Sequence, residues 1–290
     1  MLSRQEFQTL CAQHPLLLDG ATGSNLRKMG MPRDACTEEW VLHNPLPLLT
    51  LQRQYAEAGS QVLYAPTFQA QPIALKQIGL ERQTEAINAA LVALSKKAAP
   101  QCLVAGNLTT MAAFLDAWDE ENFDTMVAAY RRQIRGLIDG GADLLVAETL
   151  VYPQDAETIL TAAELEGAGA TLYSFTMQSS GDLFSGREAG PMLRELEQSG
   201  AAAVGFNCVA ADQQTPALVS RLRRYVKGPL VCKPNAGNPV INQKGEAEYD
   251  LDSQGFARVL ADCRQMGANI LGGCCGTDPE FIRAARQVLA

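Results

Sequence analysis

The sequence has few histidines, no excess of basic residues and no long apolar run. No stretch approaches the roughly 20 apolar residues of a membrane helix, and the first ten residues include Arg4 and Glu6 without an apolar core. Neither a membrane span nor a secretory signal is therefore expected. Lys and Arg number 24 against 32 Asp and Glu, a formal net charge of -8. With no basic stripe to offset this balance, we expect no nucleic-acid partner.

Histidine is present only as His14 and His43, and neither ends an apolar run. Histidine ligands make zinc a stronger Lewis acid that suits water activation. Cysteine, in contrast, occurs 8 times, without the regular spacing of a small disulfide-bonded domain. We expect reduced thiols in the cytoplasm, which favours metal binding or catalysis over a disulfide framework.

Short apolar runs alternate with longer amphipathic segments along the whole chain, and no linker divides it. The expected strands are 16–20, 61–67, 102–108, 142–149, 171–177, 201–208, 229–235 and 268–275. The expected helices are 45–58, 82–98, 122–139, 153–167, 191–199, 216–225, 252–266 and 279–289. The alternation predicts an α/β fold, a single-domain (β/α)8 TIM barrel over residues 1–290. A doubly wound open sheet is the alternative.

Polar residues gather where the expected strands end, the part of such a barrel that forms the active site. They are Asp19, Thr67, Asn107, Glu148, Asn207 and Asn235. Thiols lie there too, because Cys208 ends one expected strand and the pair Cys274 and Cys275 ends another. We expect these three thiols to lie close together across one rim.

The pair Cys274 and Cys275 lies in a glycine-rich frame, residues 272–277. Successive strand residues point to opposite faces, so both thiols can bind one ion only where the backbone leaves the extended conformation. The flanking glycines permit this. Three cysteines would make a zinc site with one position free for a reactant. The alternatives are buried apolar filler, a vicinal disulfide, an iron–sulfur cluster or a thiol-sensing metal module.

Other residues near the strand ends have more than one interpretation. Asp19 and Glu148 could receive a substrate ammonium group, or act as a helix cap and a surface ion pair. The turn at residues 20–24 could bind a carboxylate through backbone N–H groups, or only reverse the chain. Lys233 could form a Schiff base, but residues 232–235 include no acid or second cation to lower its pKa. A solvated lysine is expected there.

The aromatic residues give no clear cage for a cationic methyl donor. The candidates are Trp40, Tyr64, Phe68 and Tyr173, and only Phe68 directly follows an expected strand end. Core packing is the default expectation for the other three.

Four motifs together resemble the homocysteine S-methyltransferase family. They are Asp-Gly-Ala-Thr-Gly-Ser at 19–24, Gly-Phe-Asn-Cys at 205–208, Pro-Asn-Ala-Gly at 234–237 and Gly-Gly-Cys-Cys-Gly-Thr at 272–277. The resemblance runs in order over residues 16–289. It implies a zinc-dependent methyltransferase that converts L-homocysteine to L-methionine, with one Zn²⁺ per chain held by the catalytic residues Cys208, Cys274 and Cys275.

The resemblance also implies how the substrate is held and activated. Asp19 and Glu148 would bind its ammonium group, Gly20 belongs to the contacting turn, and Thr67 and Asn235 would be further contacts to the substrate or the zinc shell. Zinc deprotonates a bound thiol. A three-thiolate site has a formal charge of about -1, so it leaves the bound sulfur able to attack a methyl group.

The methyl donor is less clear from the sequence. The Pro-Asn-Ala-Gly-x-Pro form, through Pro239, is most similar to the methionine synthase branch of the family. The chain includes none of the folate, cobalamin and activation domains of the full-length cobalamin enzyme. We therefore expect methylcobalamin on a separate corrinoid protein, with betaine or S-methylmethionine as alternative donors. The oligomeric state is not indicated.

Overall fold

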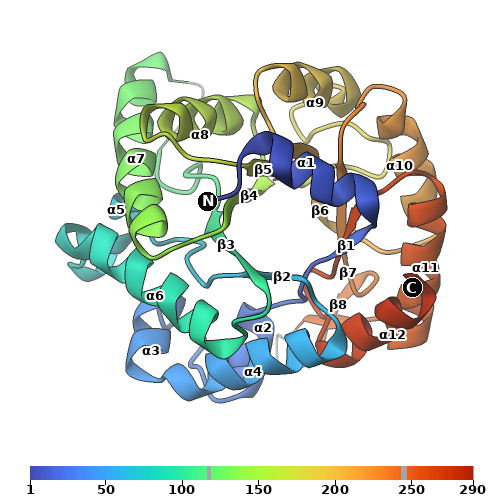
Figure 1. The fold of residues 1–290 in the computed structure, drawn as a ribbon, viewed down its shortest axis with the longest axis horizontal. Coiled ribbons are helices and arrows are strands. Elements are labelled where there is room, and N and C mark those ends of the chain that lie inside the picture. Colours follow the sequence, from blue (N-terminus) through green and yellow to red (C-terminus); the bar gives the residue numbers. More distant parts are fainter. Residues whose placement is uncertain (116–118, 243–246, 290) are drawn as a thin grey trace.

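Eight parallel strands form a ring at the centre of the computed structural model, which describes residues 1–115, 119–242 and 247–289 (Figure 1). The strands are β1 (Leu16–Leu17), β2 (Val62–Tyr64), β3 (Leu103–Leu108), β4 (Leu144–Leu150), β5 (Thr171–Phe175), β6 (Ala203–Ala210), β7 (Leu230–Asn235) and β10 (Ile270–Leu271). Their order is β1-β10-β7-β6-β5-β4-β3-β2, and a parallel bridge between Leu18 and Val62 joins the two edges. The predicted (β/α)8 barrel is confirmed, and the open sheet is wrong.

The outer ring contains all eight expected helices, each with ends within two residues of the expected ones (Figure 1). They are α4 (Pro45–Ala58), α6 (Thr84–Ala98), α7 (Phe123–Asp139), α8 (Pro153–Leu165), α9 (Ala189–Gln198), α10 (Thr215–Arg223), α11 (Ser253–Gln265) and α12 (Pro279–Leu289). Local chemistry explains several ends. Helix α4 starts at Pro45 and stops at Gly59, whose φ of 111° is left-handed, and Asp252 caps α11 by accepting a hydrogen bond from Gly255 N–H.

Several shorter elements were not expected from the sequence. They are α1 (Arg4–Gln13), α2 (Gly23–Lys28), α3 (Thr37–His43), α5 (Pro72–Leu75), three 3₁₀ turns at Lys76–Ile78, Glu81–Gln83 and Glu120–Asn122, and the antiparallel hairpin β8 (Pro239–Ile241) with β9 (Ala247–Tyr249). Helix α1 buries only Phe7 and Cys11. Its apolar periodicity is therefore too weak to detect, and a capping box of Ser3 and Glu6 fixes its start instead.

Helix α1 lies across one end of the ring of strands (Figure 1). Leu2, just before it, donates its N–H to Asp143 O at 2.7 Å and accepts from Ala170 N–H at 2.7 Å. Asp143 and Ala170 immediately precede β4 and β5, so this is the amino end of the barrel. Phe7 is fully buried there, and α1 therefore closes the barrel at the end opposite the expected site.

Alternate strand residues build two separate cores. Outward residues such as Leu63, Leu145, Phe175 and Leu230 pack against the helices. Inward residues fill the barrel together with Phe7, and these include Leu16, Val62, Leu144, Leu172, Val231 and Ile270. The same inward rows, continued by two residues at a time, lead to the polar residues at the carboxyl ends of the strands.

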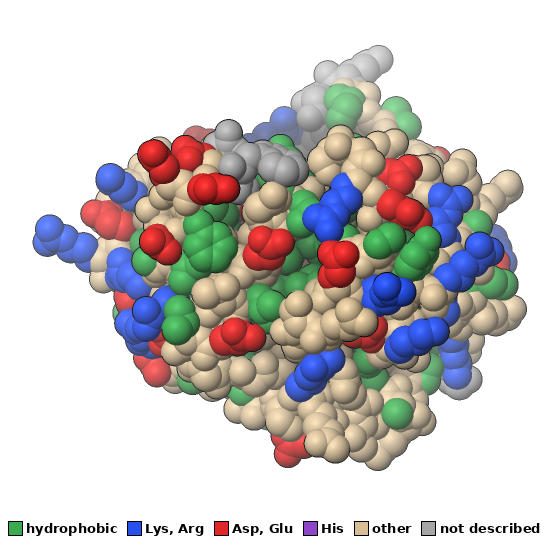
Figure 2. Space-filling view, turned by 90° about the horizontal axis from the view of Figure 1, so that it is seen from above, with side chains coloured by type: hydrophobic (Ala, Val, Ile, Leu, Met, Phe, Trp, Pro, Cys, Tyr) green, Lys and Arg blue, Asp and Glu red, His purple; other side chains and the backbone are tan. Residues whose placement is uncertain are grey.

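Acidic and basic side chains are interspersed on the face of the molecule in Figure 2. Within the described part of the chain, no helix combines the length and the apolar character needed to cross a membrane.

Candidate active site at the carboxyl ends of the strands

Three thiols meet at the carboxyl end of the barrel. The Sγ atoms of Cys208, Cys274 and Cys275 all lie within 4.8 Å of one another, and each residue is partly exposed. In the described residues this is the one group of three or more cysteine, histidine or acidic side chains found to be close enough to hold a metal ion. Residues 208 and 274–275 are thus brought together by β6 and the chain after β10, which lie on either side of β7.

An irregular backbone presents Cys208. The pairing of β6 with β7 shifts register between Asn207 and Ala210, and Cys208 itself has a φ of 57°. A residue with a Cβ rarely adopts this left-handed conformation, which costs on the order of 1–2 kcal/mol. Thr149 has the same φ of 57° where β4 shifts register. Such bulges redirect side chains beside active sites, and here one of them turns a thiol toward the rim.

The other two thiols lie beyond the end of β10, which is shorter than expected. Residues 268–275 were predicted as one strand, but pairing stops at Leu271. The chain then turns, with Thr277 N–H donating to Cys274 O at 3.2 Å and with Gly276 at a φ of 83°. Cys274 N–H donates to Pro234 O at 2.7 Å. The glycine-permitted departure from extended backbone therefore occurs, and it places both thiols on one side.

The thiols are hydrogen-bonded to one another. Hydrogen bonds from Cys208 and Cys274 lower the pKa of Cys275 to about 3, whereas the bonds to Cys274 and Cys275 raise the pKa of Cys208. Three thiols whose Sγ atoms lie within 4.8 Å of one another fit a divalent ion that accepts thiolate ligands, such as zinc.

Two polar residues contact the thiols, and this contact was not predicted from the sequence for either of them. Asn207 points its Nδ2 at Cys274 Sγ, 3.8 Å away, and also donates to Thr149 Oγ1 at 2.7 Å. Tyr249, on β9, hydrogen-bonds to Cys275 and shows a raised pKa that comes first from burial. A Cβ at Gly276 would lie 2.3 Å from the Tyr249 ring. The β8–β9 hairpin therefore packs against the turn that includes Cys274 and Cys275.

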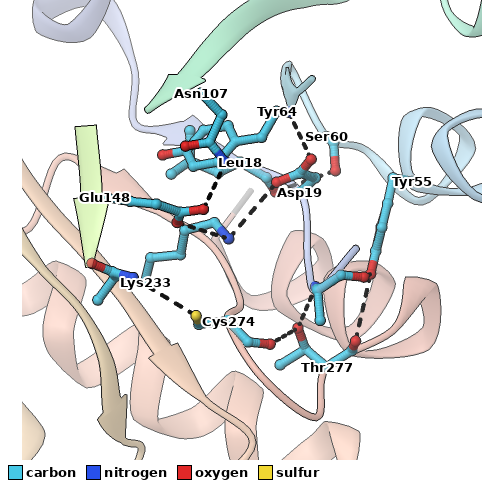
Figure 3. Close-up of polar contacts among 12 residues, drawn as sticks. Leu18, Asp19, Tyr55, Ser60, Tyr64, Asn107, Glu148, Lys233, Cys274 and Thr277 are labelled. Carbon is cyan, nitrogen blue, oxygen red and sulfur yellow. Dashed lines mark hydrogen bonds and ion pairs between the residues drawn. The ribbon is translucent and has the colours of Figure 1, made fainter. Parts of the chain in front are cut away.

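Beside the thiols, two buried acids face one lysine (Figure 3). Lys233 Nζ lies 3.9 Å from Asp19 Oδ1 and 3.9 Å from Glu148 Oε2. The Nζ atom is also 4.8 Å from the centre of the Tyr64 ring, within the range of a cation–π contact. The relative exposures of Asp19, Glu148 and Lys233 are 1%, 8% and 3%. These charges are therefore largely removed from water.

The expectation of a solvated Lys233 is wrong. The acids that accompany it come from β4 and from the end of β1, so the neighbouring sequence could not reveal them. Val231 and Lys233 are two residues apart on β7 and both face the barrel interior, and this spacing was the available signal. Burial lowers the pKa of Lys233, but Glu148, Cys274 and Asp19 raise it more, and the net pKa is above the usual value. A protonated lysine is a poor Schiff-base nucleophile.

Asp19 and Glu148 each have one oxygen occupied and one without a donor. Tyr64 N–H donates to Asp19 Oδ2 at 2.8 Å, and Asn107 Nδ2 donates to Glu148 Oε1 at 2.8 Å. Asp19 Oδ1 and Glu148 Oε2 are buried and accept no hydrogen bond from the described residues. Burial raises the pKa of Asp19 to about 7 and raises that of Glu148 as well, and Lys233 opposes both shifts. Asp19 is thus no helix cap, and Glu148 is no surface partner.

The turn after β1 is fixed by close packing. A Cβ at Gly20 would lie 2.6 Å from Tyr55 Oη and 2.8 Å from Thr277 Oγ1, so only glycine fits. Ala21 N–H donates to Thr277 Oγ1 at 3.2 Å, and Tyr55 Oη donates to Ala21 O at 2.8 Å. The turn and the cysteine turn are therefore tied together through Thr277.

The two remaining candidates have structural hydrogen bonds. Thr67 is fully buried, and its hydroxyl donates to Asn107 O at 2.9 Å and accepts from Asn107 N–H at 2.9 Å. Asn235 Oδ1 accepts from Cys275 N–H at 3.1 Å. Asn235 thus shapes the turn that holds the thiols, whereas the Thr67 hydroxyl is used to join β2 to β3.

The other residues considered from the sequence lie away from the thiols or in the core. Tyr64 and Tyr173 are buried, and Trp40 packs partly buried against the outer core. Phe68 is half-buried, and His14 and His43 are exposed. Among the remaining cysteines, Cys11, Cys102, Cys232 and Cys263 are buried and Cys36 is half-buried.

Comparison with known proteins gives consistent matches. A family model described as homocysteine S-methyltransferase matches residues 16–289. Methionine synthases of Mycobacterium leprae (strain TN) and Mycobacterium tuberculosis (strain ATCC 25618 / H37Rv) are each 26% identical over 96% of this chain. The chain spans only about a quarter of their length, 24% and 25%.

Solved structures of one protein match along nearly its whole length. The metallated form of the homocysteine methyltransferase MmuM from Escherichia coli has a TM-score of 0.81 at 28% identity, covering 96% of this chain and 98% of that chain. Its apo form has a TM-score of 0.74 at 26% identity, covering 96% and 97%.

Proposed function

The chain belongs to the homocysteine S-methyltransferase family, and from this premise we propose that it is a zinc-dependent enzyme that methylates L-homocysteine to L-methionine. The convergence of three thiols, with all Sγ atoms within 4.8 Å, carries this proposal. Residues 1–290 would form one homocysteine-binding barrel domain. Eight free cysteines are typical of a reducing compartment, so the cytoplasm remains the proposed location.

Cys208, Cys274 and Cys275 are the proposed ligands of one zinc ion. When bound there, the ion would supply the Lewis acidity that deprotonates an incoming thiol and keeps it anionic at neutral pH. Asn207 and Tyr249 orient the sulfur atoms through hydrogen bonds.

The amino-acid end of homocysteine is proposed to lie against the acid pair. Asp19 Oδ1 and Glu148 Oε2 each lack a hydrogen-bond donor in a buried place, and an ammonium group would supply donors to both. Charge-assisted hydrogen bonds of this kind are stronger than neutral ones. Gly20 and Asn235 then act by holding the turns that frame the site, with Thr67 as a further support. This arrangement would aim the substrate sulfur at the thiol cluster.

The proposed methyl donor is a methyl-corrinoid carried by another protein module, with betaine or S-methylmethionine as the alternative. The partial exposure of all three cysteines supports a donor that approaches from outside the barrel. The 26% identity to methionine synthases over 96% of the chain is consistent with it. The alternative small donors are tested alongside the corrinoid.

A donor panel tests the activity directly. Zinc-loaded protein and homocysteine are combined with free methylcobalamin, a methylated corrinoid protein, betaine or S-methylmethionine, and methionine is measured. Methionine from the corrinoid protein alone supports the proposed donor. Methionine from betaine or S-methylmethionine alone replaces that donor and keeps the family reaction. No methionine from any of the four contradicts the proposal as stated.

The rival class is a non-catalytic metal or redox module built on the same thiols. Colourless protein with about one zinc per chain argues against an iron–sulfur cluster. A thiol that enters a metal shell loses its proton, so homocysteine should release protons when it binds. Calorimetry in buffers of different ionisation enthalpy would detect this release, and its absence would favour a passive sensor.

A further inference from the structure

Lys233 is the one member of the charged cluster without a role in the reaction as proposed above. Its ammonium group stands equally far from two carboxylate oxygens, 3.9 Å from Asp19 Oδ1 and 3.9 Å from Glu148 Oε2. A direct hydrogen bond between charged groups is roughly 2.7–2.9 Å long. The lysine therefore balances charge without filling the hydrogen-bonding positions of either oxygen (Figure 3).

The charges of Asp19, Glu148 and Lys233 together determine what else this cluster can bind. Two carboxylates and one ammonium group leave one net negative charge in a place where all three side chains are at most 8% exposed. Two buried carboxylates without a cation would repel each other and take up a proton. Burial is the largest cause of the raised pKa of Asp19; Lys233 lowers this pKa, and Glu148 raises it by a smaller amount than burial does.

We infer that Lys233 is a positioning residue for the amino-acid end of the substrate, whose ammonium group offsets one of the two buried carboxylates and leaves Asp19 and Glu148 able to bind one further cation. This inference rests on the proposed function, because the further cation is the ammonium group of homocysteine. Tyr64, whose ring centre is 4.8 Å from Nζ, contacts the lysine through a cation–π interaction. The pocket would then select zwitterionic thiols over thiols that lack an amino group.

The test compares two ligands that differ only in the amino group. Binding of L-homocysteine and of 4-sulfanylbutanoate, which has the same chain and no ammonium group, is measured by calorimetry on the zinc-loaded protein. The ratio of the two affinities reports the contribution of the ammonium group. It is measured for the wild type, Lys233→Met, Lys233→Arg and the exposed-lysine control Lys227→Met.

The inference predicts a selective loss. Lys233→Met should lower the ratio by about 10-fold or more, because the unbalanced acids hold a proton in place of the substrate cation. Affinity for 4-sulfanylbutanoate should change by less than about 3-fold, and Lys233→Arg and Lys227→Met should keep the wild-type ratio. An unchanged ratio in Lys233→Met would overturn the inference. Tighter binding of homocysteine by Lys233→Met would also overturn it, because Lys233 would then compete with the substrate ammonium group for the acids.

A double variant keeps the test decisive if Lys233→Met does not fold. Combining Lys233→Met with Glu148→Gln restores one net negative charge. The decrease in the affinity ratio of this double variant should therefore be smaller than the decreases of the two single variants combined. If Lys233→Met cannot be measured, the double variant should lose no more than Glu148→Gln alone, and a larger loss would overturn the inference. A wild type that binds both ligands equally, or neither, would overturn the proposed ammonium site, and the inference with it.

Discussion

The two ends of the barrel interior differ in both chemistry and geometry. At the amino end, Phe7 of α1 packs with Leu16, Val62 and Leu144 in an apolar cluster. At the carboxyl end, the same inward rows present Tyr64, Glu148 and Lys233, with two buried carboxylate oxygens that accept no hydrogen bond from the described residues. Buried polar groups without partners are costly. One end thus supplies stability, whereas the other holds costly groups in place for a ligand.

The largest expected effect is the loss of catalysis when one sulfur atom at the carboxyl end of the barrel is replaced by oxygen. Cys208→Ser should lose most bound zinc and all detectable methyl transfer while the barrel stays folded, since a serine hydroxyl does not replace a thiolate ligand. Metal analysis, turnover and thermal melting would measure this. Cys36→Ser, at a half-buried cysteine outside the cluster, is the control and should keep both zinc and turnover. Normal turnover in Cys208→Ser would contradict the ligand assignment.

At the amino end, the expected effect is on stability alone. Phe7→Ala should reduce the free energy of unfolding by about 3–5 kcal/mol, because it opens a cavity under α1. Urea unfolding measures the loss, and the KM for homocysteine at a temperature where the variant is folded should not change. Leu10→Ala, at a half-buried position of the same helix, should cost less. A shift in KM with Phe7→Ala would break the separation between the two ends.

Neutralising either acid at the carboxyl end should weaken substrate binding and spare zinc. Asp19→Asn and Glu148→Gln are each expected to lower homocysteine affinity by about 10- to 100-fold, in line with one lost charge-assisted hydrogen bond. Glu38→Gln is a matched control, because Glu38 is also buried, 4% exposed, and accepts a hydrogen bond from Gln69 N–H at 2.8 Å. Unchanged affinity in both site variants would remove the ammonium-binding role.

The smallest expected effect, taken over one pH unit, is a dependence of stability on pH that comes from Asp19. Burial raises its pKa to about 7 from the usual 3.8 of an aspartate, so the folded state binds a proton that the unfolded state releases. This contribution to stability is full below the unfolded pKa and is lost as the pH rises toward 7, by at most about 1.4 kcal/mol per pH unit. Urea unfolding from pH 4 to 8 should show the slope in the wild type and a shallower one in Asp19→Asn. Parallel slopes would show that another group causes it.

The sequence predicted the barrel well because the repeated signal was redundant. Eight apolar runs and eight amphipathic segments gave the ring, and caps such as Pro45 and Gly59 gave helix ends within two residues. Short elements held mainly by tertiary contacts were missed, α1 and the β8–β9 hairpin among them. Their burial depends on partners far along the chain, as the contact of Tyr249 with Gly276 shows.

The site was predicted by residue type better than by environment. The meeting of Cys208 with Cys274 and Cys275 followed from barrel geometry, since all three lie at carboxyl ends of strands. The left-handed φ of 57° at Cys208 could not be predicted, because no glycine marks it. Lys233 was misjudged because its acidic neighbours are supplied by β4 and by the residue after β1, although its spacing from Val231 indicated an inward side chain.

The plug formed by α1 has a consequence for the order of events during turnover. Because Phe7 and its neighbours fill the amino end of the barrel, both reactants must enter at the carboxyl end, past the partly exposed cysteines. The acid pair is more buried than those cysteines, so under the proposed function homocysteine anchored there would have to bind before a corrinoid protein covers the entrance. The product would leave only after that protein has withdrawn, and steady-state kinetics are then expected to be sequential and ordered.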